Sequence, residues 1–305
     1  MTDWLGRTVL AVTERNFVRR TFTNTKPGKA LARRFVAGES LDEAVTVAAE
    51  LIGAGFEVSL DHLGEHVTHR QEAMQARNDY MSCLDRIGAE GLAANISVKL
   101  TQLGMGLDDD LAAASLSELA SRASEVGTSV TVDMEESDYT DATIAIYEKA
   151  QIEHGNLGIA VQSYLKRTRA DLDRLIPLGG HIRLCKGAYA ESDEVAFQSN
   201  EEVNAEFDRL LEVLMAAPET KPAIASHDEA RLAVAKRLVP DREAPYEFQL
   251  LYGVRGPLQR DLIEQGFPVR IYVPYGAAWY PYLTRRLAER PANTLFFLRA
   301  LFGRR

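Results

Sequence analysis

The stretch LGIAVQSYLKRTRADLDRLIPLGGHIRLCK (residues 157–186) contains the unit that decides the fold. Two short apolar runs, LGIAVQ and HIRLCK, flank a longer segment with helical periodicity. This is the pattern of a β-strand, a helix and a second β-strand. Strands that are buried on both faces form continuous apolar runs, so the pattern favours a parallel sheet covered by helices.

A predicted strand followed by a helical segment occurs eight times along the chain. The predicted strands are FEVSLD from Phe56, NISVKL from Asn95, SVTVDM from Ser129, LGIAVQ from Leu157, HIRLCK from His181, PAIASH from Pro222, YEFQLL from Tyr246 and VRIYVP from Val269. Eight consecutive βα units predict a closed (βα)₈ barrel of the α/β class. An open doubly wound sheet is the competing architecture, but its usual G-x-G-x-x-G motif after a strand does not occur in the sequence.

A single domain accounts for the whole length of 305 residues, since one such barrel takes about 250 residues. No run rich in Gly, Pro or Ser divides the chain, so we expect one domain over residues 1–305. Residues 1–55 precede the first strand and are expected to form a helical extension packed on the barrel. Within it, Ser40 and Glu43 have the spacing of a helix-capping box.

Composition narrows the partners and the compartment. A net charge of -9 argues against binding to nucleic acid, which calls for a basic surface. The two cysteines, Cys83 and Cys185, are too few for a secreted disulfide framework, and a reducing compartment is expected. Neither a secretion signal nor a membrane-spanning run is indicated, which predicts a cytoplasmic enzyme or binding protein for a small molecule.

Polar side chains gather at the predicted strand ends. Catalytic groups of (βα)₈ barrels come from the C-terminal ends of the strands and the loops that follow. Here those positions carry Asp61, Lys99, Asp133, Gln162, Lys186, His227 and Gln249, with Arg183 and Tyr272 inside their strands. Any one of them alone is equally compatible with a structural ion pair. Because burying so many polar groups is costly, their convergence favours a ligand site.

The segment after the last strand predicts a helix from Pro281 with Tyr282, Arg285, Arg286 and Glu289 on one side. Two adjacent guanidinium groups suit a carboxylate, and Glu289 suits an ammonium group, so together they indicate an amino-acid site. The alternative is a solvated helix in which Arg285 and Glu289 form an i,i+4 ion pair.

Several motifs together resemble the proline dehydrogenase family. They are RLCKGAY (183–189) and YPYLTRRLAERPAN (280–293), supported by ISVKLTQLG, VDMEE, ASHD and YEFQLLYG in family order. The resemblance covers roughly residues 30–303 and fits the short monofunctional enzymes. It implies a distorted (βα)₈ barrel with the last helix over the barrel mouth, noncovalent FAD, and oxidation of L-proline to Δ1-pyrroline-5-carboxylate.

The resemblance also implies a role for individual residues. Asp133 and Arg183 are the expected catalytic residues, with the Arg183 guanidinium near flavin N5. The expected substrate-binding residues are Lys99, Tyr272, Tyr282, Arg285, Arg286, Glu289 and Glu65. The expected cofactor-binding residues are Met134, Gln162, Arg183, Lys186, Gly187, Ala188, Ser226, His227 and Gln249.

The expected partners are L-proline, a quinone or other electron acceptor, and a separate pyrroline-5-carboxylate dehydrogenase. The C-terminal FFLRALFGRR combines apolar and basic groups suited to peripheral contact with a bilayer, although a packed helix is favoured for it.

Other functions remain open at this level. Lys99 or Lys186 in a barrel also suits a Schiff-base aldolase, and the paired arginines also suit a non-catalytic barrel that binds an amino acid. His62, His66 and His69 have helical spacing, but a lone helix lacks the remaining ligands of a metal site, so no metal is expected.

Overall fold

The structure is a computed structural model that describes residues 32–288, with side chains described through Thr284. Four of the expectations above therefore lie outside the described residues. They concern residues 1–31, the side chains of Arg285 and Arg286, Glu289, and the C-terminal FFLRALFGRR.

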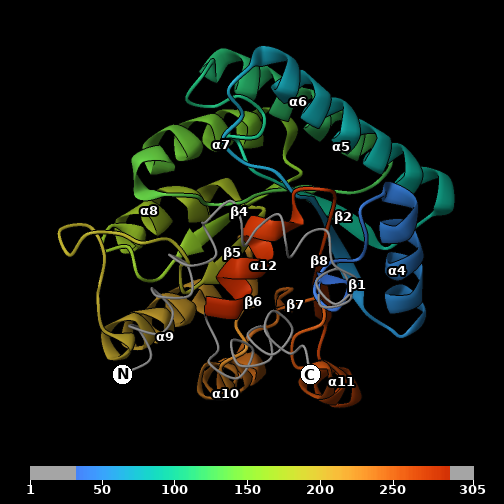
Figure 1. Ribbon diagram of the computed structural model, residues 1–305. Coiled ribbons are helices and arrows are strands. Elements are labelled where there is room, and N and C mark those ends of the chain that lie inside the picture. Colours follow the sequence, from blue (N-terminus) through green and yellow to red (C-terminus); the bar gives the residue numbers. More distant parts are fainter. Residues whose placement is uncertain (1–31, 289–305) are drawn as a thin grey trace, which may run out of the picture.

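Eight parallel strands close into a barrel in the order of the sequence, β1-β2-β3-β4-β5-β6-β7-β8 (Figure 1). Each strand begins within one residue of its predicted start, so the predicted (βα)₈ barrel is confirmed. The strands are β1 (Glu57–His62), β2 (Ala94–Val98), β3 (Val130–Val132), β4 (Leu157–Gln162), β5 (His181–Cys185), β6 (Lys221–Ala225), β7 (Glu247–Leu251) and β8 (Val269–Tyr275).

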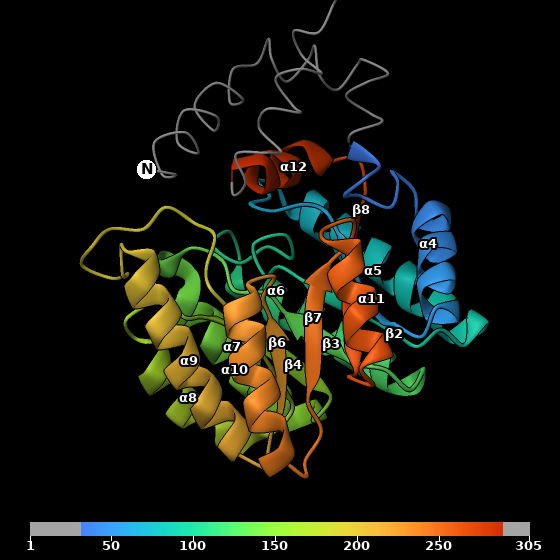
Figure 2. The same cartoon turned by 90° about the horizontal axis from the view of Figure 1, so that it is seen from below.

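Helices alternate with the strands and surround the barrel on its outside (Figure 2). The helices are α4 (Leu41–Gly53), α5 (Arg70–Glu90), α6 (Asp109–Glu125), α7 (Thr140–His154), α8 (Thr168–Leu175), α9 (Asn200–Ala216), α10 (Glu229–Leu238), α11 (Gly256–Glu264) and α12 (Trp279–Ala288). Helix α4 begins at the predicted capping box, in which Ser40 accepts from the Glu43 backbone and Glu43 accepts from the Ser40 backbone. Among these helices none is long and apolar enough to cross a membrane.

The two faces of the barrel wall differ in chemistry. Residues that point outward, such as Val58, Leu60 and Ile96, are fully buried in the apolar core beneath the helices. Because side chains alternate along a strand, the residues between them point into the barrel. Many of these are polar, including Ser59 and Asn95, whereas bulky apolar residues usually fill such interiors. Polar groups inside a closed barrel must satisfy one another, and this requirement shapes the site.

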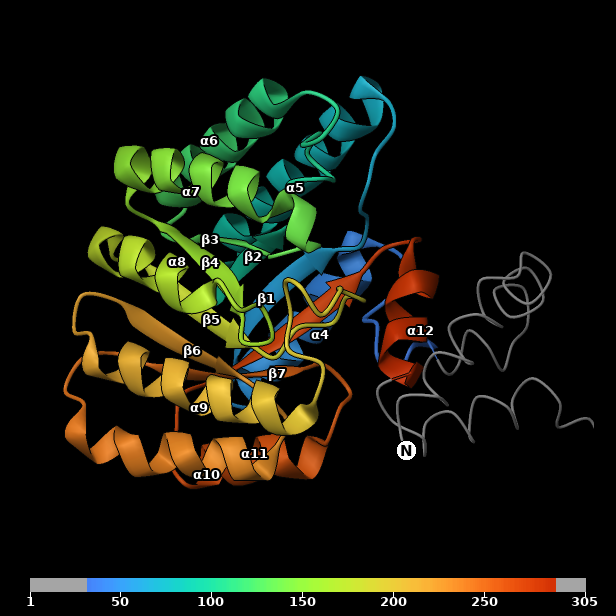
Figure 3. The ribbon, with the colours of Figure 1, turned by 90° about the vertical axis from the view of Figure 1, so that its left-hand side faces the viewer.

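Helix α12 lies across the end of the barrel toward which the strands run (Figures 1 and 3). Its apolar residues Trp279, Tyr282 and Leu283 are buried in one cluster with Leu63, which directly follows β1 at that end, and with Phe35. The predicted position of the last helix over the barrel mouth is therefore confirmed.

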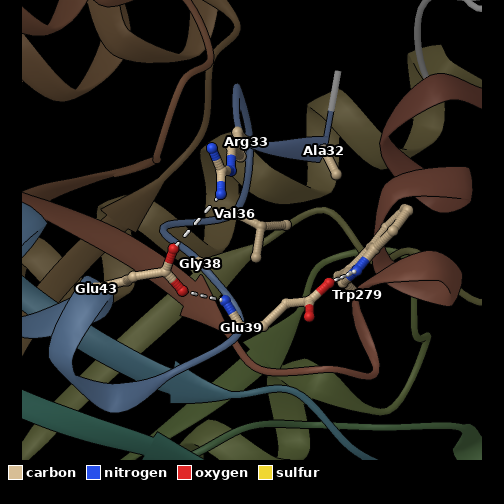
Figure 4. Close-up of a pocket in the computed structure, with 7 residues that line it drawn as sticks. All are labelled: Ala32, Arg33, Val36, Gly38, Glu39, Glu43 and Trp279. Carbon is tan, nitrogen blue, oxygen red and sulfur yellow. Dashed lines mark hydrogen bonds and ion pairs between the residues drawn. The ribbon is translucent and has the colours of Figure 1, made fainter. Parts of the chain in front are cut away.

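A small pocket lies on the outer flank of this helix, between residues 32–43 and Trp279 (Figure 4). The Trp279 indole donates to Glu39 at 3.2 Å across it. Its lining residues are Ala32, Arg33, Val36, Gly38, Glu39, Glu43 and Trp279, none of which belongs to the polar interior of the barrel.

Candidate active site

A buried cluster of charged groups occupies the barrel interior beneath α12. Lys99, directly after β2, places its Nζ 3.2 Å from Asp61 Oδ1 and 3.3 Å from Asp133 Oδ2. Tyr272 of β8 lies beside it, with its hydroxyl 3.5 Å from Lys99 Nζ. Residues that are far apart in the sequence meet here because neighbouring strands bring their C-terminal ends to the same rim of the barrel.

Asp133 is the most heavily bonded member of the cluster. Its Oδ1 accepts from Ser97 at 2.7 Å and from Arg183, and its Oδ2 accepts from Tyr272 at 2.7 Å and from Lys99. Burial alone raises the pKa of this carboxyl group, but Lys99 and Arg183 together hold it below its ordinary value. Asp133 is therefore a fixed anion between two cations.

The pKa values of Lys99 and Asp61 are shifted for different reasons in the same surroundings. Burial lowers the pKa of Lys99, yet the two carboxylates outweigh burial and the net pKa is raised, so the lysine stays protonated. Burial raises the pKa of Asp61, and Lys99 only partly opposes that shift. The cluster thus contains one firmly ionised carboxylate and one that is easier to protonate.

Arg183 of β5 is also held in place by Gln249 and by the Tyr272 ring. Its Nε donates to Gln249 Oε1 at 2.5 Å, and its guanidinium carbon lies 5.1 Å from the centre of the Tyr272 ring. The Gln249 amide nitrogen donates to Glu247 at 2.6 Å. Burial raises the pKa of Glu247, but Arg270 and Lys221 hold it well below its ordinary range, so this carboxylate can only accept. Glu247 therefore turns the Gln249 amide oxygen toward Arg183.

Among the buried polar atoms that have no hydrogen-bond partner in the described part of the chain are Nη2 of Arg183 and Oε1 of Gln162, the last residue of β4. The Gln162 amide nitrogen contacts the Met134 carbonyl oxygen at 3.4 Å. An unpaired buried donor and an unpaired buried acceptor are costly unless a ligand bonds both. The pair fits a planar heterocycle that carries both acceptor and donor atoms.

The turn after β5 brings backbone close to the same end of the barrel. Lys186 pairs with Asp228 at 2.7 Å, and Gly187 has φ +110, a conformation that residues with a side chain rarely adopt. A Cβ atom at Gly187 would lie 2.3 Å from the Tyr164 ring. Only glycine therefore allows this turn to pack against Tyr164.

Sequence comparison with known proteins identifies the family of this chain. The family model for proline dehydrogenase matches residues 44–299. The chain belongs to the proline dehydrogenase family. Proline dehydrogenase 1 of Bacillus subtilis is 36% identical over 293 residues, which cover 93% of this chain and 97% of that protein. The proline dehydrogenase of Deinococcus radiodurans is 34% identical over 280 residues, covering 89% of this chain and 90% of that protein.

Solved structures are similar as well. The crystal structure of proline utilization A (PutA) from Bdellovibrio bacteriovorus, inactivated by N-propargylglycine, matches with a TM-score of 0.80 and 25% identity. The match covers 86% of this chain and 33% of that chain, so this proline dehydrogenase family member corresponds to one part of the longer protein.

The structure brings several of the predicted site residues into direct contact. Lys99, Asp133, Arg183, Gln249 and Tyr272 form one hydrogen-bonded cluster. The other predicted residues with described side chains lie in loops and elements at the same end of the barrel: Glu65, Met134, Gln162, Lys186, Gly187, Ala188, Ser226, His227 and Tyr282.

Some of these residues have structural partners of their own. Ser226 Oγ accepts from the Asp228 backbone at 3.1 Å, and His227 Nε2 accepts from the Leu251 backbone at 3.0 Å. Tyr282 is buried in α12, and Glu65 is half-buried in the loop after β1.

Two members of the cluster have no role predicted from the sequence. Asp61 is one of the strand-end residues without an expected ligand, and no function is predicted for Ser97. Strand alternation supplies the missing signal for Ser97, because it lies between the inward-pointing Asn95 and Lys99. Both residues contact charged groups of the cluster.

The expectation of helical spacing for the three histidines was wrong. His62 ends β1, residues 63–69 form a loop, and α5 begins only at Arg70. The His62 ring stacks on Tyr275, whereas His69 precedes α5 as its N-cap.

His66 instead approaches two carboxylates of the loop after β3. His66, Glu135 and Glu136 each bring one potential ligand atom within 4.8 Å of the others. These groups already contact one another or Thr101, since His66 meets Glu136 at 3.2 Å and Glu135 accepts from the Thr101 backbone at 3.1 Å. The cluster therefore needs no ion to explain it.

Proposed function

We propose that this chain oxidises L-proline to Δ1-pyrroline-5-carboxylate, the first step of proline catabolism, using noncovalently bound FAD. Membership of the proline dehydrogenase family supports the reaction. FAD is proposed as the cofactor because two buried polar atoms beneath α12, Arg183 Nη2 and Gln162 Oε1, have no hydrogen-bond partner in the described part of the chain. When bound, FAD accepts at N5 the hydride that leaves C5 of proline.

The residues around the unpaired atoms suit the flavin ring. Arg183 offers a fixed donor and a positive charge where negative charge grows during hydride transfer, which is electrostatic stabilisation. Asp133 holds that guanidinium from one side and Gln249 from the other, so its orientation is set before the ligand binds. Gln162 offers an acceptor for a ring N–H, next to the Met134 backbone.

The remaining parts of FAD are assigned to the turn after β5 and the loop after β6. Lys186, Gly187 and Ala188 present backbone because Gly187 adopts φ +110, and Ser226 and His227 are expected along the rest of the cofactor. The ion pair between Lys186 and Asp228 joins the two loops at 2.7 Å.

Proline is proposed to bind between this cluster and α12. Lys99 and Tyr272 form the polar floor, and Tyr282 contributes from the helix. In the family-derived assignment Arg285 and Arg286 grip the carboxylate, Glu289 meets the amine, and Glu65 is the acidic partner of the arginine pair.

A Schiff-base aldolase fits the site poorly. A lysine must lose its proton before it attacks a carbonyl group. Lys99 lies between Asp61 and Asp133, which raise its pKa, and Lys186 pairs with Asp228. Neither lysine is set up as a nucleophile. Treatment with borohydride and substrate should therefore leave no covalent adduct, whereas an adduct on either lysine would favour the aldolase.

The substrate assignment is tested by Arg286→Lys, which keeps the charge and removes the planar fork. We expect a large rise in KM for proline with little change in flavin content. Arg169→Lys is the matched control, because Arg169 is half exposed in an ion pair with Asp173 on α8. Unchanged kinetics in Arg286→Lys would show that the pair faces solvent. Absence of turnover with an artificial acceptor in the unaltered protein would favour a non-catalytic amino-acid barrel.

The wider setting follows from the same proposal. A quinone or another acceptor reoxidises the flavin, and a separate pyrroline-5-carboxylate dehydrogenase consumes the product. The enzyme acts as one domain over residues 1–305 in the cytoplasm, with peripheral contact to the membrane at the acceptor. Cosedimentation with anionic vesicles that contain quinone, before and after flavin reduction, tests this contact.

A further inference from the structure

Asp61 and Asp133 share Lys99, but they differ sharply in their other partners. Asp133 accepts from four side chains, namely Ser97, Arg183, Tyr272 and Lys99. Asp61 accepts from Lys99 at 3.2 Å through Oδ1, while its Oδ2 is buried and has no hydrogen-bond partner among the residues with described side chains. Since hydrogen bonds to a carboxylate stabilise its charged form, Asp133 is held as an anion far more firmly than Asp61.

The other groups around Asp61 do not compensate for this difference. The Tyr272 hydroxyl lowers the pKa of Asp61, but its single hydrogen is directed to Asp133 at 2.7 Å, and burial still raises the pKa of Asp61 overall. Tyr80 of α5 directs its hydroxyl to the His62 carbonyl or to Gln102, at 3.1 and 3.2 Å.

Tyr275 of β8 and Asp133 are further titratable groups that interact with Asp61, and neither is a cation. Lys99 is thus the one cation among the described groups that acts on Asp61 at short range. The side chain of Asp61 is 1% exposed, so bulk water offers it little further stabilisation.

We infer that Asp61 is the group that receives the substrate's amine proton, passed to it through Lys99. This inference rests on the proposed oxidation of proline, in which Lys99 contacts the substrate. A secondary ammonium group has no lone pair, so it must lose a proton before its nitrogen can form a double bond to C5. Asp61 contacts Lys99 and does not itself contact the substrate in this arrangement.

The proton transfer balances without any further reactant. One N–H bond of the substrate ammonium breaks, and its proton forms a new N–H bond on Lys99 Nζ. Lys99 accepts this proton on the lone pair that it gains when its own N–H bond to Asp61 breaks first and an O–H bond forms at Asp61 Oδ1. Lys99 remains an ammonium group, Asp61 becomes neutral, and the substrate amine gains the lone pair that is needed when hydride leaves C5.

Electrostatics favours Asp61 over Asp133 as the end point. The pKa of Asp61 is raised because burial outweighs Lys99, whereas the pKa of Asp133 is lowered by Lys99 and Arg183 against the effect of burial. Neutralising Asp61 also leaves two cations, Lys99 and Arg183, facing one carboxylate. The added positive charge stabilises the negative charge that a hydride brings to the site.

The first experiment measures the proton directly in the flavin-loaded enzyme. Infrared difference spectra, recorded anaerobically on mixing with L-proline, should show a new carbonyl band of a protonated carboxylic acid that shifts in D₂O. The band should disappear in Asp61→Asn. It should remain in Glu135→Gln, the matched control, because Glu135 is a second buried carboxyl group whose pKa burial raises but which bonds Thr101 rather than Lys99.

The second experiment follows the rate of flavin reduction by proline against pH. Asp61→Asn should lower kcat about 100-fold near neutral pH, the usual scale of acid–base assistance, with little change in KM. The deficit should shrink toward about pH 10, where an amine of this type loses its proton in solution. Glu135→Gln should keep the pH profile of the unaltered enzyme.

The outcomes separate the two proposals. If proline fails to reduce the flavin of the unaltered enzyme, the proposed function itself fails. If reduction proceeds but no acid band forms, or if the band or the neutral-pH rate survives in Asp61→Asn, the role of Asp61 is refuted. Should Asp61→Asn not fold, the Glu135→Gln spectrum decides, since loss of the band there assigns the proton to Glu135 and its retention supports Asp61.

Discussion

Replacing Asp133 by asparagine removes one negative charge from the buried cluster and preserves its shape. The carboxylate accepts from Ser97 and Arg183 on one oxygen and from Tyr272 and Lys99 on the other. An asparagine has a single acceptor oxygen, and its amide nitrogen only donates. Whichever way the amide turns, either Arg183 or Lys99 then faces a donor in place of an anion.

The cost follows from the burial of the cations. The side chains of Arg183 and Lys99 are 7% and 9% exposed, so solvent screens them little. Removing one partner of a buried ion pair costs about 3–5 kcal/mol, and we expect Asp133→Asn to lower the free energy of unfolding by that amount near neutral pH. Urea denaturation of the purified variant measures it.

The control is the same substitution at a surface ion pair. Asp141 pairs with Arg167 at 2.6 Å but is 82% exposed, so Asp141→Asn should change stability by at most about 0.5 kcal/mol. A cost below about 1 kcal/mol for Asp133→Asn would refute the reasoning, because it would mean that the buried cations do not depend on this anion.

The contribution of Asp133 to the free energy of unfolding should decrease in acid. The folded-state pKa of Asp133 lies below its ordinary value of 3.8, so its stabilising effect is complete above that pH. The effect is lost as the pH falls through the lowered folded-state pKa. The difference between the unaltered protein and Asp133→Asn should therefore shrink in acid below about pH 4.

Three further predictions concern other parts of the barrel. Burial lowers the pKa of His181 to about 3, so the free energy of unfolding should fall as the pH drops from about 6.5 toward 3. Urea denaturation at several pH values should show a smaller fall in His181→Gln. An equal fall in both proteins would contradict a buried neutral ring. Gly187→Ala should reduce the flavin content several-fold, because the new Cβ would lie 2.3 Å from the Tyr164 ring. Flavin absorbance of the purified variant measures this content. Full occupancy would argue against the turn as a cofactor site. Ser40→Ala should lower the free energy of unfolding by about 1 kcal/mol, measured by urea denaturation, and leave proline turnover unchanged. An unchanged free energy of unfolding would show that the capping box of Ser40 and Glu43 does not stabilise the protein.

The barrel could be predicted from the sequence because its strands are buried on both faces. Runs such as LGIAVQ and VRIYVP are recognisable without tertiary context, and each observed strand begins within one residue of its predicted start. The rim residues followed from the same pattern, since strand ends mark one face of the barrel. Lys99 and Asp133 directly follow β2 and β3, as this pattern predicted.

The partners within the site could not be predicted in the same way. They depend on the register between strands whose residues lie more than thirty positions apart, as for Asp61 with Lys99. The orientation of the Gln249 amide depends on the charge state of Glu247, which Arg270 and Lys221 set from other strands. The histidine spacing suggested a helix, but β1 runs through His62 and the chain then turns into a loop.

The polar rim beneath α12 is proposed to hold an oxidising flavin next to proline. The most direct test is the absorbance spectrum of the purified protein, supplied with FAD, before and after anaerobic addition of L-proline. We expect the absorption bands of bound flavin to be present and to bleach on addition of proline. A protein that does not bind FAD, or whose flavin bands persist with proline present, would contradict it.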